Sequence, residues 1–137
     1  MPLRPLPVVL RPLAYLWALP TTSVGLGAAV LTLVTGGRAR VHTGVLEVWG
    51  GFAGFVLRRL VPLPGGAAAM TLGHVVIARD PKTHDRTRSH ERVHVRQVER
   101  WGPLFIPAYL LASAWIWIRR GDAYHDNPFE REAYAAE

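Results

Sequence analysis

The sequence predicts an α+β fold: membrane-associated helices at the N-terminus, a short antiparallel sheet, an HExxH helix, and a second helix at the C-terminus. Three observations predict this order. Residues 12–37 carry no charge, residues 38–79 are rich in glycine and β-branched side chains, and residues 90–94 read His-Glu-Arg-Val-His. The chain has 137 residues, which is enough for one modest hydrophobic core.

Composition excludes several classes of protein. Half of the residues are apolar and 19% are charged, so the chain is not a disordered one. The formal net charge is +6, and 15 of the 16 basic residues are arginine. There is no cysteine, which rules out disulfides, cysteine-ligated zinc, iron–sulfur clusters and thiol catalysis.

The first element is the uncharged run of 26 residues at 12–37. A membrane span needs about 20 apolar residues. Pro20 interrupts the run, so it forms either one kinked span or two short helices of a re-entrant hairpin. Tyr15 and Trp17 suit the level of the lipid headgroups. We interpret residues 1–37 as a membrane-associated helical segment; a cleaved signal peptide, a soluble core helix and a loop are the alternatives.

The middle of the chain predicts the sheet. Residues 38–49 alternate around Gly44, as a strand or hairpin does, and residues 49–60 are also compatible with a short amphipathic helix. Residues 68–79 include the β-branched run Val75-Val76-Ile77 and predict one strand, with Gly73 at a bulge or at a close approach of another segment.

A helix is expected over residues 89–101, with Thr87 or Ser89 as its N-cap and Gly102 at its end. The following uncharged stretch, residues 103–118, predicts an apolar helix that is either interfacial or part of a soluble core.

The HExxH motif carries the chemistry. His90 and His94 are four residues apart and share one helix face, so both imidazoles reach one ion. Neutral imidazole is a good zinc ligand, and the Glu91 carboxylate is placed to take a proton from a water molecule at the metal. Gln97 lies on the same face.

A catalytic zinc site needs a third protein ligand. The Asn127-Pro128 pair predicts the start of a second helix. Glu130 and Glu132 are two residues apart on it and cannot face the same ion. The downstream candidates are His125, Asp126, Glu130 and Glu132.

The pattern HExxHxxQ, an apolar helix and a terminal NPxExEA resembles the gluzincin group of zinc metallopeptidases, and more narrowly its small, uncharacterised bacterial members that are membrane-associated. The resemblance covers residues 70–137. It implies Zn²⁺ as cofactor, a peptide or protein substrate, and Glu130 as third ligand, with Glu132 as the fallback. Because Glu130 and Ala133 share one helix face while Glu132 turns away by about 200°, the helix geometry agrees.

The resemblance also implies supporting residues. Gln97, Asn127 or Glu132 is expected to orient a ligand histidine, and Tyr124 or His125 to stabilise an oxyanion. An edge strand before the HExxH helix is expected to hold extended substrate. It would include the following residues: Gly73, His74, Val75 and Val76.

The predicted function is therefore a membrane-associated zinc metallopeptidase in which residues 38–137 form a zincin-like catalytic domain. The alternative is a non-catalytic small membrane protein that binds a structural metal or anionic lipid. Nucleic acid is not an expected partner, because the basic residues 79–100 lack interleaved aromatic side chains. A di-iron site is excluded by the absence of a second ExxH. Arginines flank both ends of residues 12–37, so the charge distribution leans only slightly toward a cytoplasmic catalytic half.

Overall fold

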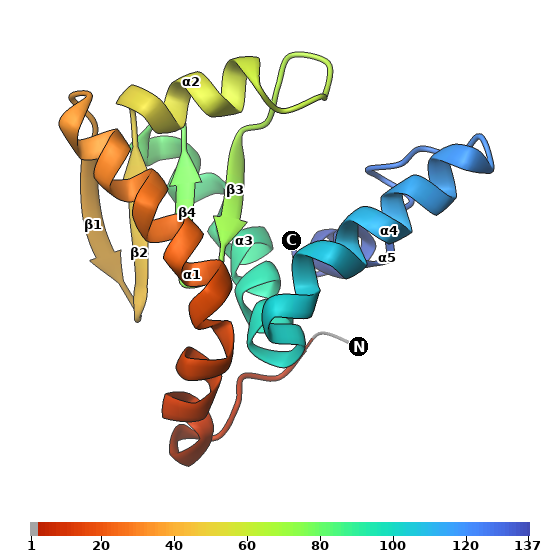
Figure 1. Cartoon of the computed structure of the whole chain (residues 1–137), viewed down its shortest axis with the longest axis horizontal. Helices are drawn as coiled ribbons and strands as arrows, with labels where there is room; N and C mark the ends of the chain where they lie inside the picture. The colour runs from red at the N-terminus through yellow and green to blue at the C-terminus, as the bar shows by residue number, and fades with distance from the viewer. Residues whose placement is uncertain (1–2) are drawn as a thin grey trace.

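The computed structural model describes residues 3–137 and has the predicted α+β class (Figure 1). A four-stranded sheet lies between helices, and the C-terminal helices project from one side. The helices and strands run as follows: 3-10 helix η1 (Val8–Leu10), α1 (Arg11–Val34), β1 (Arg38–His42), β2 (Val45–Trp49), α2 (Gly51–Arg59), β3 (Ala69–Leu72), β4 (Val75–Ala78), α3 (Pro81–Trp101), 3-10 helix η2 (Gly102–Leu104), α4 (Phe105–Ile118) and α5 (Pro128–Tyr134).

The sheet is mixed, so the prediction of an antiparallel sheet is wrong. Its strand order is β1-β2-β4-β3. The outer pairs are antiparallel, but β2 and β4 are parallel, with Leu46 opposite Val75. The reason is α2, which follows β2 and carries the chain across the sheet before β3 and β4 form.

Helices cover both faces of the sheet. On one face, Val48, Val75 and Ile77 pack against Ala29 of α1 and Leu57 of α2. On the other face, β2 and β4 meet α3 through a smaller cluster: Val45, Val76 and Val95. Alternation along the strands therefore divides their side chains between two helical layers.

Helix α1 is continuous through Pro20, so the interpretation as two short helices is wrong. Its buried side is a stripe of small residues at helical spacing: Ala14, Ala18, Thr21, Gly25, Ala29 and Thr32. At Gly25 the helix approaches the backbone of β3 so closely that a Cβ would collide with Leu72. Large side chains such as Leu16, Val24 and Val30 are exposed instead.

Two helical stretches are long and apolar enough to cross a membrane, namely Val8–Val34 and Pro81–Ile118. In the second stretch the apolar part is α4, because α3 is rich in charge. Figure 1 shows α4 pointing away from the sheet, and five of its large apolar side chains are exposed: Leu110, Leu111, Trp115, Trp117 and Ile118.

Residues 68–79 form a hairpin and not one strand, which corrects two predictions. Gly73 and His74 make the turn between β3 and β4, and Gly73 has a φ of +71° that glycine adopts without strain. Gly73 is therefore no bulge, but the predicted close approach is confirmed, because a Cβ there would collide with Thr22 of α1. Val75 and Val76 belong to β4, whose two edges are already paired, so the predicted substrate strand is not an edge strand. The free edge next to β4 is β3.

Helix α3 begins eight residues earlier than expected. Asp80 is its N-cap, since its carboxylate accepts a hydrogen bond from the Thr83 backbone N–H at 2.8 Å, and Pro81 occupies the first turn. Thr87 and Ser89 are therefore interior residues. The start of α5 agrees with the prediction, because the Asn127 side chain accepts from the Phe129 backbone N–H.

Candidate metal centre

Three buried side chains converge between α3 and α5. His90 Nε2 lies 3.2 Å from His94 Nε2, and Glu130 Oε2 lies 3.0 Å from His90 Nε2. Glu130 Oε1 lies 3.4 Å from His94 Nε2. All three residues are less than 7% exposed. The structure thus brings Glu130, and not Glu132, to the two histidines.

The far side of His94 is held by a hydrogen-bonded chain. Gln97 Nε2 donates to Glu132 Oε2 at 2.8 Å and to the Phe129 carbonyl at 3.0 Å. The Gln97 Oε1 must then be the atom that lies 2.8 Å from His94 Nδ1, and it accepts a proton from that nitrogen. Gln97 and Glu132, two of the three candidates for this role, therefore take part in orienting His94, whereas Asn127 bonds to residues of α4 and α5 instead.

His90 is fixed in the same way by a residue that the sequence did not indicate. Its Nδ1 lies 2.9 Å from a carboxylate oxygen of Glu137, which can only accept from it at neutral pH. In the neutral form of each imidazole, Nδ1 carries the proton and Nε2 carries a lone pair. Two lone pairs and a carboxylate then face one point, and only a cation or a shared proton relieves their repulsion.

The pKa values agree with a site that attracts positive charge. Burial lowers the pKa of His94, but its hydrogen bond to Glu130 and the charge of Glu91 outweigh burial and raise it to about 8. The same balance raises the pKa of His90. Burial raises the pKa of Glu130, but the hydrogen bonds with His90 and His94 outweigh it and hold the value well below the usual range.

Glu91 is buried between α3 and β3. The Thr71 hydroxyl donates to its Oε2 at 2.7 Å, and Thr71 belongs to the edge strand. Burial is the largest effect on this carboxyl and raises its pKa, so Glu91 holds a proton more readily than an exposed glutamate. A carboxyl with such a pKa is suited to accept and return a proton.

Tyr109 of α4 is a further member of the cluster that sequence reasoning missed. Its hydroxyl donates to Glu130 Oε1 at 2.6 Å. Asn127 ties α5 to α4 by donating to the Tyr109 carbonyl and the Ser113 hydroxyl. A signal existed, because Tyr109 and Ser113 are the only side chains in residues 105–118 with hydroxyl groups and are four apart.

The remaining predicted residues lie outside the cluster. His125 is exposed and pairs with Asp122 at 2.8 Å. Tyr124 contacts the Tyr134 hydroxyl at 3.3 Å, and it is Tyr134 that packs on the His90 ring, with centroids 4.6 Å apart. Neither Tyr124 nor His125 forms a hydrogen bond with the three converging side chains. The tyrosines that contact them are Tyr109, through its hydroxyl, and Tyr134, through its ring.

No family model, curated protein or solved structure matches this chain. The resemblance to the gluzincins therefore rests on the motif residues alone, and the geometry of the cluster is what bears on function.

Proposed function

We propose that the protein is a membrane-associated zinc metallopeptidase. The observation that carries the proposal is the set of separations among the three converging ligand atoms: 3.0, 3.2 and 3.4 Å. Tetrahedral zinc with bonds of about 2.0–2.1 Å keeps its ligands about 3.3–3.4 Å apart. The His90, His94 and Glu130 side chains fit that requirement with small adjustments.

The composition of the cluster favours a catalytic role over a structural one. Structural zinc sites have four protein ligands, whereas catalytic sites have three. Within the described residues 3–137, His90, His94 and Glu130 are the one group of histidine and acidic side chains close enough to share an ion. Zinc bound there would supply a Lewis acid that polarises a carbonyl group and acidifies a water molecule.

The chain's own residues have separate tasks in hydrolysis. Glu91 accepts the proton of the attacking water and later delivers it to the leaving amine, for which its raised pKa is suited. Gln97 and Glu137 keep the two imidazoles in the tautomer that presents Nε2. Tyr109 donates to Glu130 and thereby fixes which oxygen faces His90.

An extended peptide is the substrate that the neighbouring sheet favours. Strand β3 is an edge strand, and its Thr71 contacts Glu91 directly. A peptide that adds to the edge of β3 satisfies its backbone hydrogen bonds regardless of sequence and passes beside the cluster. The substrate strand predicted at Gly73–Val76 is thus replaced by Ala69–Leu72.

The membrane part of the proposal rests on how α1 is packed. A helix of a soluble protein buries its large apolar side chains, but α1 buries alanine, glycine and threonine and exposes leucine, valine and tryptophan. This arrangement is typical of helices in lipid. Because α1 packs along the sheet, we propose that it lies in the bilayer interface together with α4 and its exposed Trp115 and Trp117.

The test is metal analysis and peptide hydrolysis on detergent-purified protein. Wild type is expected to hold one zinc and to cleave a casein or peptide-library substrate. His94→Ala is expected to lose zinc, while Glu91→Gln keeps zinc and loses turnover, because an amide cannot accept the proton. The matched control is Glu99→Gln, an equal change on the side of α3 that faces away from His90 and His94. If wild type holds zinc but cleaves no substrate, the site is a structural metal site and the proposed peptidase activity is refuted.

A further inference from the structure

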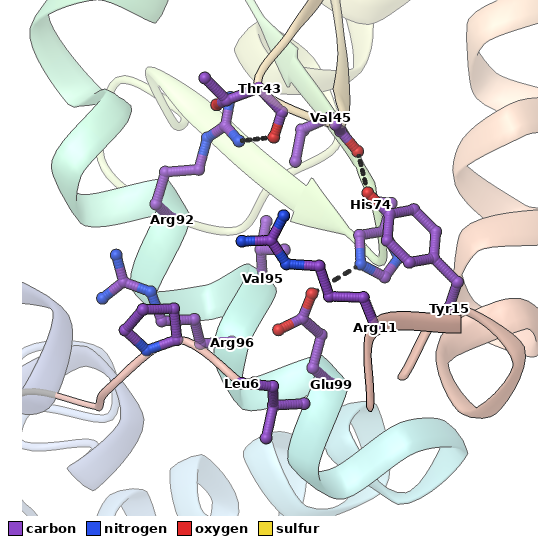
Figure 2. Close-up of a pocket in the computed structure, with 12 residues that line it drawn as sticks. Leu6, Arg11, Tyr15, Thr43, Val45, His74, Arg92, Val95, Arg96 and Glu99 are labelled. Carbon is purple, nitrogen blue, oxygen red and sulfur yellow. Dashed lines mark hydrogen bonds and ion pairs between the residues drawn. The ribbon is translucent and has the colours of Figure 1, made fainter. Parts of the chain in front are cut away.

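A cavity lies on the face of α3 opposite to the metal cluster. It has a volume of about 650 Å³ and is lined by the N-terminal segment, α1, the β1–β2 turn and α3 (Figure 2). Arg92 and Arg96 line it, each two residues beyond a histidine of the cluster, which is about 200° around the helix. The two sites are therefore separate and share only the helix.

The cavity holds positive charge that the protein does not neutralise. Figure 2 shows Arg11 reaching from α1 across the cavity toward Arg92 and Arg96. Arg92 donates to the carbonyls of His42 and Thr43, and Arg96 donates to the carbonyl of Leu3. Carbonyl oxygens satisfy these donors but leave the charge in place.

The acidic residues nearby are already engaged. Glu99 is the one acid among the lining residues, and it pairs with His74 Nε2 at 2.9 Å. Glu47 lies 3.7 Å from Arg92, but it binds Arg88 and Arg40 at 2.8 Å each. The Arg11 side chain makes no hydrogen bond or ion pair with any other residue in the range 3–137. Arg11 is exposed, whereas Arg92 and Arg96 are half-buried, and half-buried positive charge that no acid fully neutralises favours a bound anion.

The walls of the cavity are rigid. The Tyr15 ring stacks on the His74 ring with centroids 3.8 Å apart, and the Tyr15 hydroxyl donates to the Gly44 carbonyl at 2.6 Å. His74 is 5% exposed, and its Nδ1 is the one buried side-chain nitrogen or oxygen without a partner in the described part of the chain. Tyr15 and His74 therefore form one fixed wall of the cavity.

We infer that this cavity binds a phosphate group, and that the phosphate is the headgroup of an anionic phospholipid. Three guanidinium groups surround the space, and a guanidinium group can donate two parallel hydrogen bonds to a pair of phosphate oxygens. Arg11 is the first residue of α1, directly after the exposed apolar residues Val8, Val9 and Leu10. Charge for a headgroup and apolar surface for its acyl chains thus adjoin at one end of α1.

The experiment compares lipid and soluble phosphate. Flotation with phosphatidylcholine vesicles, with and without phosphatidylglycerol, measures the lipid preference. Calorimetry with sn-glycerol 1-phosphate and inorganic phosphate on the detergent-solubilised protein measures the soluble source. Arg11→Gln and Arg96→Gln remove charge from the cavity, and the control Arg86→Gln removes the same charge from the exposed start of α3. Thermal unfolding of each variant reports whether it folds.

Phosphatidylglycerol is expected to tighten vesicle binding about 10-fold or more, and Arg11→Gln to lose about 5–10-fold of that gain. Because the Arg11 side chain is exposed and makes no hydrogen bond within residues 3–137, its replacement does not disturb the fold. The control is expected to keep the preference. Calorimetric binding of glycerol phosphate without a lipid preference assigns the cavity to a soluble phosphate. Equal losses in Arg86→Gln and Arg11→Gln, or binding of neither probe, would overturn the inference.

Discussion

Replacing Gln97 with leucine tests how far the metal centre depends on a residue that does not contact the ion. Gln97 is 1% exposed and makes three hydrogen bonds, to His94, to Glu132 and to the Phe129 carbonyl. Leucine has a similar size but bonds none of them. The His94 Nδ1–H then lacks its acceptor, and the ring is free to rotate or to change tautomer.

The magnitude follows from these lost bonds. A buried donor without a partner costs about 1–3 kcal/mol, so the free energy of unfolding falls by that amount. Loss of a hydrogen bond that orients a metal-ligating histidine weakens metal binding about 10–100-fold. We therefore expect Gln97→Leu to fold, to unfold at a lower temperature, and to bind zinc with a Kd raised by about this factor.

The assay is competition for zinc against a chromogenic chelator, paired with thermal unfolding. The matched control is His84→Leu, because His84 is also 1% exposed on α3 and also hydrogen-bonds a buried partner, the Val48 carbonyl at 2.9 Å. The control is expected to lose stability without losing zinc affinity. Wild-type zinc affinity in Gln97→Leu would refute the view that the hydrogen bonds of Gln97 orient His94.

Three other predictions concern charge. Glu130→Ala is expected to abolish stoichiometric zinc binding by mass spectrometry, whereas Glu132→Ala keeps zinc at reduced affinity; the reverse order would reassign the third ligand. The pKa of His94 is about 8 against an ordinary 6.5, so its proton stabilises the metal-free fold below pH 6.5, and this stabilisation is lost as pH rises through 8. Thermal melts of metal-free protein should therefore fall over that range while zinc affinity rises, and a flat profile for both would contradict it. Burial raises the pKa of Glu47, but hydrogen bonds from Arg88 and Arg40 outweigh burial and lower the pKa to about 2. Glu47→Gln should therefore lower the free energy of unfolding by about 2–3 kcal/mol at neutral pH, and the difference from wild type should vanish as pH falls from 4.5 to 2.

The sequence was informative wherever structure depends on neighbours along the chain. The HExxH spacing placed His90 and His94 on one helix face, and the Asn127-Pro128 pair marked the start of α5 correctly. A local signal was ambiguous where one residue pair suits two different structures. Asp80-Pro81 directly follows the strand predicted over residues 68–79, and the same pair is a good helix start that begins α3.

Strand pairing was the part that local patterns did not determine. Alternating residues predict that a strand exists but not which strand lies beside it. The parallel pairing of β2 with β4 depends on α2 packing over Val48 and Ile77, a contact between segments far apart in sequence. The interpretation of residues 68–79 as one edge strand failed for the same reason, because the Gly73-His74 turn folds half of it into the centre of the sheet.

The proposed metal ligands His94 and Glu130 lie 36 residues apart in the sequence, and the structure shows what makes them meet. Asn127, which caps α5, is fully buried and donates to the backbone of Tyr109 and to Ser113, so α5 is fastened to α4. Tyr109 donates in turn to Glu130 itself. Helix α4, which is apolar on all sides and exposed over most of its length, therefore positions the third ligand. The surface we assign to the membrane and the cluster we assign to zinc are built on the same helix, so a change in the environment of α4 acts on Glu130 through one hydrogen bond.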